Sequence, residues 1–371
     1  MKFDWDQLER EFRGAAGDVP GLELDPAHIE RMAAEIASGT VGPERNRIAG
    51  RLEPARLADL DRLEAFSARD VERYRKLGRA ALERGEVAAA LLNGGMATRF
   101  GGGVKGIVPA IGPRSFLELK LAQARSLSPA PLLVMNSFAT HAATLRFLAE
   151  RELERDVHPF LQGVSLRLTP TGEIFRDRAG RISLYAPGHG DFPHAVRDSG
   201  RLALLRERGV RALMLSNIDN LGAVLDPVIV GYHLAHTRPL TAEAAESAPG
   251  DAGGAPAFVD GALQIVEGFR WPQGFDLGRL EMINTNTFVM SLDLLEQAHP
   301  LTWFYVEKDV DGRTAVQMER LVGELSARVE TSYLVTPRRG PSGRFFPTKT
   351  REDLERIKSD PDLAARYNRT P

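Results

Sequence analysis

Residues 93–106 are the part of the sequence best suited to binding a charged ligand. They follow an apolar run, and six of the fourteen are glycine, with Arg99 and Lys105 among the rest. Glycine-rich backbone can curl so that successive N–H groups point at one anion, and a helix that begins nearby adds its positive dipole. Two cations beside such a loop suit a triphosphate. The sequence therefore predicts a loop that binds the phosphates of a nucleotide.

Two common phosphate loops fit this stretch poorly. A P-loop needs Ser or Thr after its lysine to hold magnesium, but Gly106 follows Lys105. The dinucleotide fingerprint GxGxxG matches the spacing of Gly101, Gly103 and Gly106. It begins well after the strand ends, however, and the next predicted strand ends without an acidic residue for a ribose. A dehydrogenase is therefore disfavoured.

Asp219 is the strongest single candidate for a metal ligand. It follows the apolar stretch ALMLSN at the carboxyl end of a predicted strand, where open α/β sheets bind their ligands. A carboxylate there suits Mg²⁺, which takes one or two protein carboxylates together with phosphate oxygens and water. The next helix is better capped by Asp226. Asn217 lies on the same face of the extended strand and is placed to reach a sugar.

A second set of polar residues suits the hydroxyl groups of a sugar. Asn284 and Asn286, in INTNT, share one face of a predicted strand because side chains alternate with period two. Each asparagine amide offers both a donor and an acceptor. Glu267 is a candidate acceptor for a further hydroxyl.

The composition excludes several classes of protein. The 371 residues carry 48 basic and 50 acidic side chains, and the formal net charge of −2 is unlike that of a nucleic-acid-binding protein. The sequence has no cysteine, so disulfides, thiolate catalysis and cysteine-ligated zinc are ruled out. The charged N-terminus lacks a signal-peptide core, and no stretch approaches the roughly twenty apolar residues that span a bilayer. We expect a cytoplasmic protein with no nucleic-acid or membrane partner.

Alternating strands and helices predict an α/β fold with a mostly parallel sheet. The predicted strands are short apolar runs at 87–93, 131–137, 164–168 and 210–217. The predicted helices between and after them are 115–127, with Ser115 as its cap, 144–155, 201–209 and 227–236. Two further predicted strands, at 258–269 and 282–290, have no clear helix between them, which makes the sheet mixed. The first 85 residues show helical periodicity.

Seven stretches, taken in order, resemble the UDP-sugar pyrophosphorylase family. They are LNGGMATRFGGGVKG at 92–106, FLQ at 160–162, PGHGD at 187–191, SNIDNLGAVLD at 216–226, INTNT at 283–287, EKDVDG at 307–312 and PTKT at 347–350. The resemblance implies a Rossmann-like (GT-A-like) nucleotidyltransferase core. We expect an N-terminal helical subdomain over 1–85, the catalytic domain over 86–336 and a short C-terminal segment over 337–371. The C-terminal β-helix of eukaryotic relatives is expected to be absent.

The resemblance also implies a role for each motif residue. The residues that contact the phosphates during catalysis would be Arg99, Lys105 and Lys349. The residues that bind the nucleotide would be Gly94, Gly95, Gln162, Gly188 and Asp219, with Asp219 also the metal ligand. The residues that bind the sugar phosphate would be His189, Asn217, Glu267, Asn284, Asn286 and Lys308. The family has Glu and Gln in the opposite order near Glu267, which makes Gln264 the alternative for the role of Glu267.

The reaction implied by the resemblance joins UTP and a sugar 1-phosphate, with glucose 1-phosphate as the expected acceptor and Mg²⁺ as the cofactor. A sugar phosphate is already ionised near neutral pH, so the reaction needs charge neutralisation rather than a general base. Two alternatives stay open: a uridylyltransferase for another sugar 1-phosphate, and a non-catalytic UDP-sugar-binding protein. The sequence does not decide between a monomer and a small oligomer.

Overall fold

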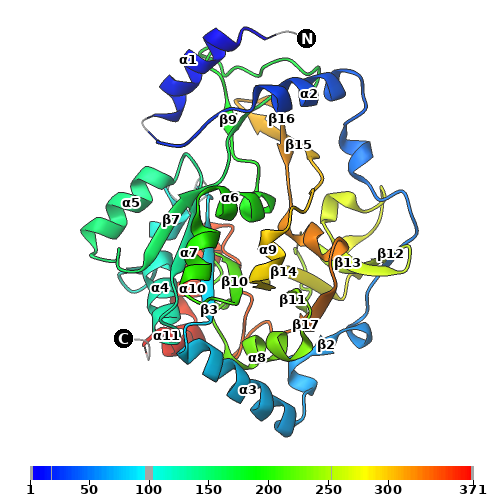
Figure 1. Cartoon of the computed structure of the whole chain (residues 1–371). Helices are drawn as coiled ribbons and strands as arrows, with labels where there is room; N and C mark the ends of the chain where they lie inside the picture. Colours follow the sequence, from blue (N-terminus) through cyan, green and yellow to red (C-terminus); the bar gives the residue numbers. More distant parts are fainter. Residues whose placement is uncertain (1–2, 18, 97–102, 252, 369–371) are drawn as a thin grey trace.

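The computed structural model describes residues 3–17, 19–96, 103–251 and 253–368. Its centre is an eight-stranded sheet (Figure 1). In spatial order the strands are β2 (Asp61–Arg62), β17 (Thr331–Val335), β11 (Leu240–Glu246), β14 (Met282–Ser291), β10 (Ala212–Asn217), β3 (Val87–Asn93), β6 (Leu132–Asn136) and β7 (Val157–Leu161).

Strand β14 runs against all the other strands of this sheet. It pairs antiparallel with its neighbours β10 and β11, whereas the remaining pairs are parallel. The predicted mixed, mostly parallel sheet is therefore confirmed. Because the carboxyl ends of parallel strands meet at one edge, the residues that follow β3, β7 and β10 converge there.

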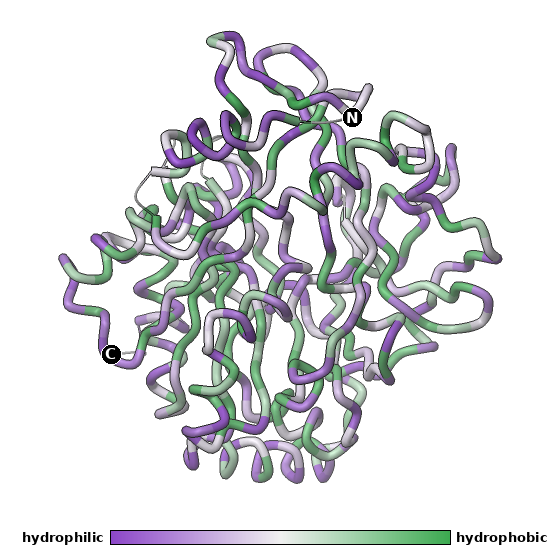
Figure 2. The backbone as a smooth tube through the Cα atoms, turned by 45° about the horizontal axis from the view of Figure 1, so that its top comes forward, coloured by the Kyte–Doolittle hydropathy of each residue, from purple (hydrophilic) through white to green (hydrophobic). Residues whose placement is uncertain are grey.

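Helices cover both faces of the sheet, as a parallel sheet requires. They are α3 (Ala68–Glu83), α4 (Phe116–Arg125), α5 (His141–Glu150), α6 (Phe192–Asp198), α7 (Arg201–Glu207), α8 (Pro227–His236) and α9 (Leu292–Glu296). Neighbouring residues of β3 enter different hydrophobic clusters, Leu91 on the side of α3, α4 and α8 and Leu92 on the side of α6 and α7. Figure 2 shows the resulting apolar strands through the middle of the molecule.

Helices α3 and α8 cross on one face of the sheet at unusually close range. A Cβ on Gly78 would clash with the Pro227 carbonyl, and one on Gly231 would clash with the Tyr74 carbonyl. Glycine at both positions lets the two backbones touch. Helix α3 therefore packs directly on the core, although it belongs to the first 85 residues of the chain.

The first two helices, α1 (Trp5–Ala16) and α2 (Pro26–Ala37), lie at one end of the molecule beside the β15–β16 hairpin (Figure 1). That hairpin joins β15 (Phe304–Val310) and β16 (Arg313–Glu319). Apolar residues of both helices share one cluster with β16 and with the small β8 (Ser165–Leu166) and β9 (Leu184–Tyr185) pair. The predicted N-terminal helices are confirmed.

The same N-terminal region contributes two short strands that its hydrophobic pattern did not predict. Strand β1 (Leu52–Pro54) pairs with β12 (Ala255–Val259), which continues into β13 (Ala262–Val266). Strand β2 pairs with β17 at the edge of the main sheet. Both strands are too short to show a repeat of hydrophobic residues.

Two of the predicted strands lie outside the main sheet. Residues 258–269 are not one strand, because they hold the end of β12 and all of β13, which pair with each other in a separate three-stranded sheet. Residues 164–168 were expected in the main sheet, but only Ser165–Leu166 form a strand, and it pairs with β9. Strand β7, at 157–161, takes that place in the sheet. Pro159 makes this strand difficult to predict from the sequence, because proline removes a ladder N–H and is confined to edge strands. Strand β7 is an edge strand.

The predicted helix starts are better matched. Ser115 caps α4 in a capping box with Glu118, and Asp226 caps α8 by accepting from the Val228 and Ile229 N–H groups. The chain ends in α10 (Arg351–Ser359) and α11 (Pro361–Asn368), and a short hairpin, β4 (Pro109–Ile111) and β5 (Arg114–Ser115), precedes α4. Among the described residues, no helix has both the length and the apolar character needed to span a bilayer.

Candidate active site

Lys105 and Asp219 form an ion pair at the carboxyl end of β10. The Lys105 ammonium donates to Asp219 Oδ2 at 2.8 Å and to the Thr348 carbonyl at 3.1 Å. The two side chains keep 20% and 14% of their surface exposed, so both can reach a ligand. Three separate parts of the chain, the glycine loop, β10 and the 347–350 segment, therefore meet at one point.

Asp219 fits Mg²⁺ but not a metal that needs several protein ligands. Within the described parts of the chain, no group of three or more His, Asp or Glu side chains could enclose a metal ion. A lone carboxylate beside a cationic loop matches the habit of Mg²⁺, which takes most of its oxygens from phosphates and water. The ammonium that now neutralises Asp219 marks the place where positive charge is stable.

The glycine loop closes on itself beside β3. The Lys105 N–H donates to the Gly95 carbonyl at 3.2 Å, and a Cβ on Gly106 would clash with Asn93 Oδ1. Glycine at 106 is thus required by the buried Asn93 side chain. The predicted phosphate ligand Arg99 lies outside the described residues, so its position stays a prediction.

Gln162 packs against Gly94, and both residues are predicted to bind the nucleotide. A Cβ on Gly94 would clash with Gln162 Nε2. Gln162 is buried, and its Oε1 has no hydrogen-bond partner among the described residues. A buried amide oxygen without a partner is costly, which is expected if a ligand supplies the missing donor.

The PGHGD loop lies next to Gln162 and is held by Asp191. Asp191 accepts from the Gly163 N–H at 2.6 Å and forms an ion pair with Arg320. Gly188 adopts a φ of 91°, where only glycine is free of strain. Asp191 was not singled out from the sequence, although its place within the motif could have drawn attention to it.

His189 is neutral and has a defined tautomer. The Val322 N–H donates to its Nδ1 at 3.1 Å, and burial lowers the pKa of the imidazole to about 4. Since Nδ1 accepts, the proton must sit on Nε2. His189 can therefore donate one hydrogen bond to a ligand without adding a positive charge.

Strand β14 presents its asparagines through a bulge rather than by simple alternation. The register with β11 shifts between Glu243 and Ala244, and Asn286 has a φ of 54°. The prediction that Asn284 and Asn286 share a face by period two is therefore wrong in its reason. The bulge nevertheless links them, because the Asn286 N–H donates to Asn284 Oδ1 at 3.1 Å.

The Asn286 side chain turns towards β10. Its Nδ2 donates to Asn217 Oδ1 at 2.9 Å, and its Oδ1 is buried without a partner among the described residues. Asn217 is the last residue of β10 and Asp219 follows two residues later, so this contact brings the asparagines close in the chain to the ion pair. Buried amide atoms without partners again mark a place where a ligand can bind.

Glu267 is half-buried and lies beside Gly254. Burial raises the pKa of its carboxyl to about 7, while Arg270 and a hydrogen bond from the Gly254 backbone oppose the shift. The Gly254 carbonyl accepts from the Asn284 N–H at 2.7 Å, which connects Glu267 to the β14 bulge. Gln264, the alternative, lies in β13 opposite Ala257.

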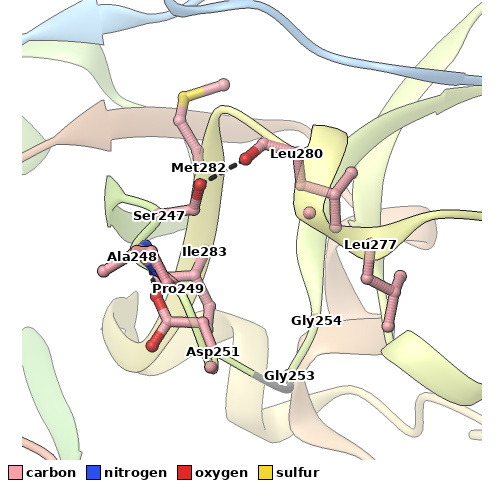
Figure 3. A pocket seen from close by; sticks show the side chains of 12 residues that line it. Ser247, Ala248, Pro249, Asp251, Gly253, Gly254, Leu277, Leu280, Met282 and Ile283 are labelled. Carbon is pink, nitrogen blue, oxygen red and sulfur yellow. Dashed lines mark hydrogen bonds between the residues drawn. The ribbon is translucent and has the colours of Figure 1, made fainter.

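A cavity of about 390 Å³ lies beside Gly254 and the start of β14 (Figure 3). It opens between the 247–251 loop, Gly253–Gly254 and the start of β14 at Met282 and Ile283. Ser247 bonds to the Leu280 carbonyl across it. Ile283 precedes Asn284, so the shape of this cavity and the position of the β14 bulge depend on the same backbone.

The two distal lysines lie apart from each other. Lys308, on β15, forms an ion pair with Glu319 at 3.4 Å, and Glu319 also packs near Gly188. Lys349 is exposed and lines a cavity of about 690 Å³. The Thr348 carbonyl accepts from Lys105, and the cavity that Lys349 lines is also lined by Arg338 and Arg339. Their contacts with phosphates stay predictions.

Comparison with known proteins places these residues in a family. The family model described as UTP–glucose-1-phosphate uridylyltransferase matches residues 49–364. The chain belongs to this family. Its UTP–glucose-1-phosphate uridylyltransferase relative from Pyrus pyrifolia is 26% identical over 93% of this chain and 78% of its own length. The one from Solanum tuberosum is 28% identical over 72% of this chain. The chain spans only 60% of that second relative's length.

Solved structures agree on the fold of this family. A UDP-glucose pyrophosphorylase V402W mutant from Leishmania major superposes with a TM-score of 0.74, at 24% identity over 96% of this chain and 80% of its own. A putative UDP-N-acetylglucosamine pyrophosphorylase from Entamoeba histolytica gives 0.69, at 17% identity over 84% of this chain and 87% of its own. At these identities the match describes the fold alone.

Proposed function

We propose that this chain transfers the uridylyl group of UTP to a sugar 1-phosphate, releasing pyrophosphate, with glucose 1-phosphate as the preferred acceptor. The observation that carries the proposal is the Lys105–Asp219 pair beside Thr348. A metal-binding carboxylate, a phosphate-binding lysine and the PTKT segment meet there. Membership of the uridylyltransferase family supports the same reaction.

The reaction forms one bond and breaks one. An oxygen of the sugar phosphate attacks the α-phosphorus of UTP, and the bond from that phosphorus to the bridging oxygen of the β-phosphate breaks. The electron pair leaves with pyrophosphate. The second pKa of a phosphate ester is about 6, so the nucleophile is ionised at pH 7 and needs no general base. The enzyme's task is to align two anions and to neutralise them.

Lys105 and Asp219 divide this task. When a nucleotide binds, the Lys105 ammonium leaves the Asp219 carboxylate and contacts phosphate oxygens. The freed carboxylate would hold Mg²⁺, which supplies positive charge to the phosphates when bound. In the free protein the two charges neutralise each other. The side chains of Lys105 and Asp219 are only 20% and 14% exposed, so an unpaired charge on either would be costly. Arg99 and Lys349 complete the proposed set of phosphate contacts.

Neutral side chains would recognise the uracil and the sugar. Gln162 offers the uracil edge an amide oxygen that has no partner among the described residues, and Gly94 and Gly95 keep the base close to the backbone. His189 donates through Nε2, and Asn217, Asn284 and Asn286 supply donors and acceptors for sugar hydroxyls. Lys308, near Gly188, would close on the sugar phosphate.

A pyrophosphate-release panel tests the proposal. It sets ATP, CTP, GTP and UTP against the 1-phosphates of glucose, galactose, glucuronate and N-acetylglucosamine. We expect turnover with UTP and the greatest kcat/KM with glucose 1-phosphate. Turnover with UTP and another sugar would favour a uridylyltransferase of different specificity. Binding of UDP-glucose without any release of pyrophosphate would show a non-catalytic binder and refute the proposal.

A further inference from the structure

The loop between β10 and α8, residues 217–226, is held from outside in an unusually complete way. We name it the Asp219 loop. Seven consecutive main-chain carbonyls within it, from Asp219 to Leu225, each accept a hydrogen bond from a side chain elsewhere in the chain. The donors, in order along the loop, are Thr348, Lys120, Tyr367, Arg366, Lys120 again, Arg344 and Gln123.

These donors come from only two places. Lys120 and Gln123 lie on α4, and the others belong to the last part of the chain, between Arg344 and Tyr367. Loops normally run over the surface and give their carbonyls to water. The Asp219 loop is instead covered, so its carbonyls must be paired within the protein. Its shape is therefore fixed by α4 and by the C-terminal segment.

Lys120 is the centre of this arrangement. It is only 3% exposed, and its ammonium donates to Ser216 Oγ at 2.9 Å, to the Asn220 carbonyl at 3.2 Å and to the Ala223 carbonyl. The ammonium therefore uses all three of its N–H donors, one on Ser216 in β10 and two on carbonyls of the Asp219 loop. Lysine is almost never buried so fully without a strong reason.

The Asp219 carboxylate also acts electrostatically on Lys120. Burial lowers the pKa of the Lys120 ammonium to about 7, and the Asp219 carboxylate is the largest of the influences that oppose this shift. The bonds to Ser216 and Asn220 lie on either side of Asp219 in the sequence. A side chain that holds both flanks of Asp219 therefore restrains the backbone from which the Asp219 carboxylate projects.

Tyr367, in α11, supports the Asp219 loop from the C-terminal segment. Its side chain is fully buried, and its hydroxyl donates to the Leu221 carbonyl at 2.8 Å. Its own carbonyl accepts from Arg114 at 2.6 Å, which anchors α11 to the hairpin before α4. The two supports of the loop are therefore connected to each other.

We propose that Lys120 and Tyr367 are positioning residues that hold the Asp219 loop in the shape that binds Mg²⁺ together with UTP. The proposal rests on the function proposed above. Both side chains are almost fully buried, and Gln162 and Gly94, which would recognise the base, follow β7 and β3 rather than β10. Loss of either support should therefore weaken the contribution of the metal to UTP binding and leave recognition of uridine unchanged.

Calorimetric titration with UTP, in excess Mg²⁺ and separately in EDTA, tests this directly. For the wild-type chain we expect Mg²⁺ to tighten UTP binding. In the variant Lys120→Met, the gain in UTP affinity from Mg²⁺ should be about tenfold smaller than in the wild-type chain, because the hydrogen bonds of a charged group are lost. In Tyr367→Phe the gain should be about threefold smaller, because one neutral hydrogen bond is lost. Affinity in EDTA should change by less than about twofold, because no group that reads uridine is altered.

A matched control is Tyr333→Phe. Tyr333 is also buried, and its hydroxyl donates to the Leu263 carbonyl at 2.8 Å, away from the Asp219 loop. In this variant the ratio of UTP affinity in Mg²⁺ to UTP affinity in EDTA should equal that of the wild-type chain. If Lys120→Met does not fold, Tyr367→Phe decides alone. A ratio for Tyr367→Phe equal to that of Tyr333→Phe would overturn the positioning role. A wild-type chain whose UTP affinity does not respond to Mg²⁺ would instead refute the metal in the proposed function.

Discussion

The nucleotide side and the sugar side of the candidate site are built in different ways. The nucleotide side uses residues that directly follow parallel strands: Gly94 after β3, Gln162 after β7 and Asp219 after β10. The sugar side uses the antiparallel strand β14 and its bulge at Asn286. The first is placed by the topology of the sheet, and the second by a local departure from regular structure.

The two sides also differ in charge. Lys105 and Asp219 are a charged pair, kept partly in contact with solvent. Asn284, Asn286 and the neutral His189 carry no charge, and burial raises the pKa of Glu267 to about 7. This difference matches the proposed ligands, because phosphates require charge compensation and sugar hydroxyls require pairs of donors and acceptors. Mutations on the two sides should therefore have effects of different size and kind.

The largest effect is expected at the charged pair. Lys105→Ala and Asp219→Ala should each lower kcat by roughly 100- to 1,000-fold, as loss of a group that stabilises transition-state charge does. Lys358→Ala, which removes a surface lysine paired with Glu355, is the matched control and should keep full activity. Steady-state pyrophosphate release, with circular dichroism to confirm folding, measures the effect. Near-normal kcat in both site variants would refute their roles.

The next effect concerns the choice of nucleotide. A Cβ on Gly94 would clash with the Gln162 amide, so Gly94→Ala and Gln162→Leu should damage the same contact. We expect each to reduce the preference for UTP over CTP by roughly 10- to 100-fold, since an unpaired imide edge is then buried. The ratio of kcat/KM values for the two nucleotides measures this. An unchanged ratio would mean that the base binds elsewhere.

A smaller effect is expected on the sugar side. Asn286→Gly keeps the left-handed backbone of the bulge but removes the amide that bonds to Asn217. It should raise the KM for glucose 1-phosphate about tenfold, as loss of one or two neutral hydrogen bonds does, and leave the KM for UTP within about twofold. Asn286→Ala adds strain at positive φ and should also lower stability. Equal changes in both KM values would contradict the division into two sides.

The smallest effect concerns pH and Glu267. Burial raises its pKa to about 7 from the ordinary value of 4.5, so the folded protein holds this proton more tightly than the unfolded chain does. Stability should therefore decrease as the pH rises from about 4.5 to about 7 and then become constant, as far as this group is concerned. Glu267→Gln should remove that component. Thermal unfolding of both proteins between pH 5 and 8 measures it, and parallel curves would contradict the assignment.

The place in the fold of the proposed nucleotide-binding residues could be predicted from the sequence, because these residues follow regular strands. The strand at 87–93, the caps Ser115 and Asp226, and the meeting of Lys105 with Asp219 all follow from short-range patterns and from the geometry of a parallel sheet. The resemblance of seven ordered stretches to the family is confirmed by the family match over 49–364.

The rest depends on contacts that no local pattern contains. Strand β7 is disguised by Pro159, and the bulge at Asn286 arises from its pairing with β11. Lys120 reads as an ordinary polar position of an amphipathic helix, and only the fold shows it buried against the Asp219 loop. Asp191 likewise acquires its importance from Gly163 and Arg320. Long-range partners of this kind cannot be inferred from spacing along the chain.

The most direct test of the central claim is a crystal structure of the chain with UTP and Mg²⁺. The account predicts that the triphosphate lies at the carboxyl end of β10, that the metal contacts Asp219, and that the Lys105 ammonium has moved from this carboxylate to a phosphate oxygen. A bound nucleotide elsewhere, or at this edge with the Lys105–Asp219 pair intact and no metal beside it, would contradict the account.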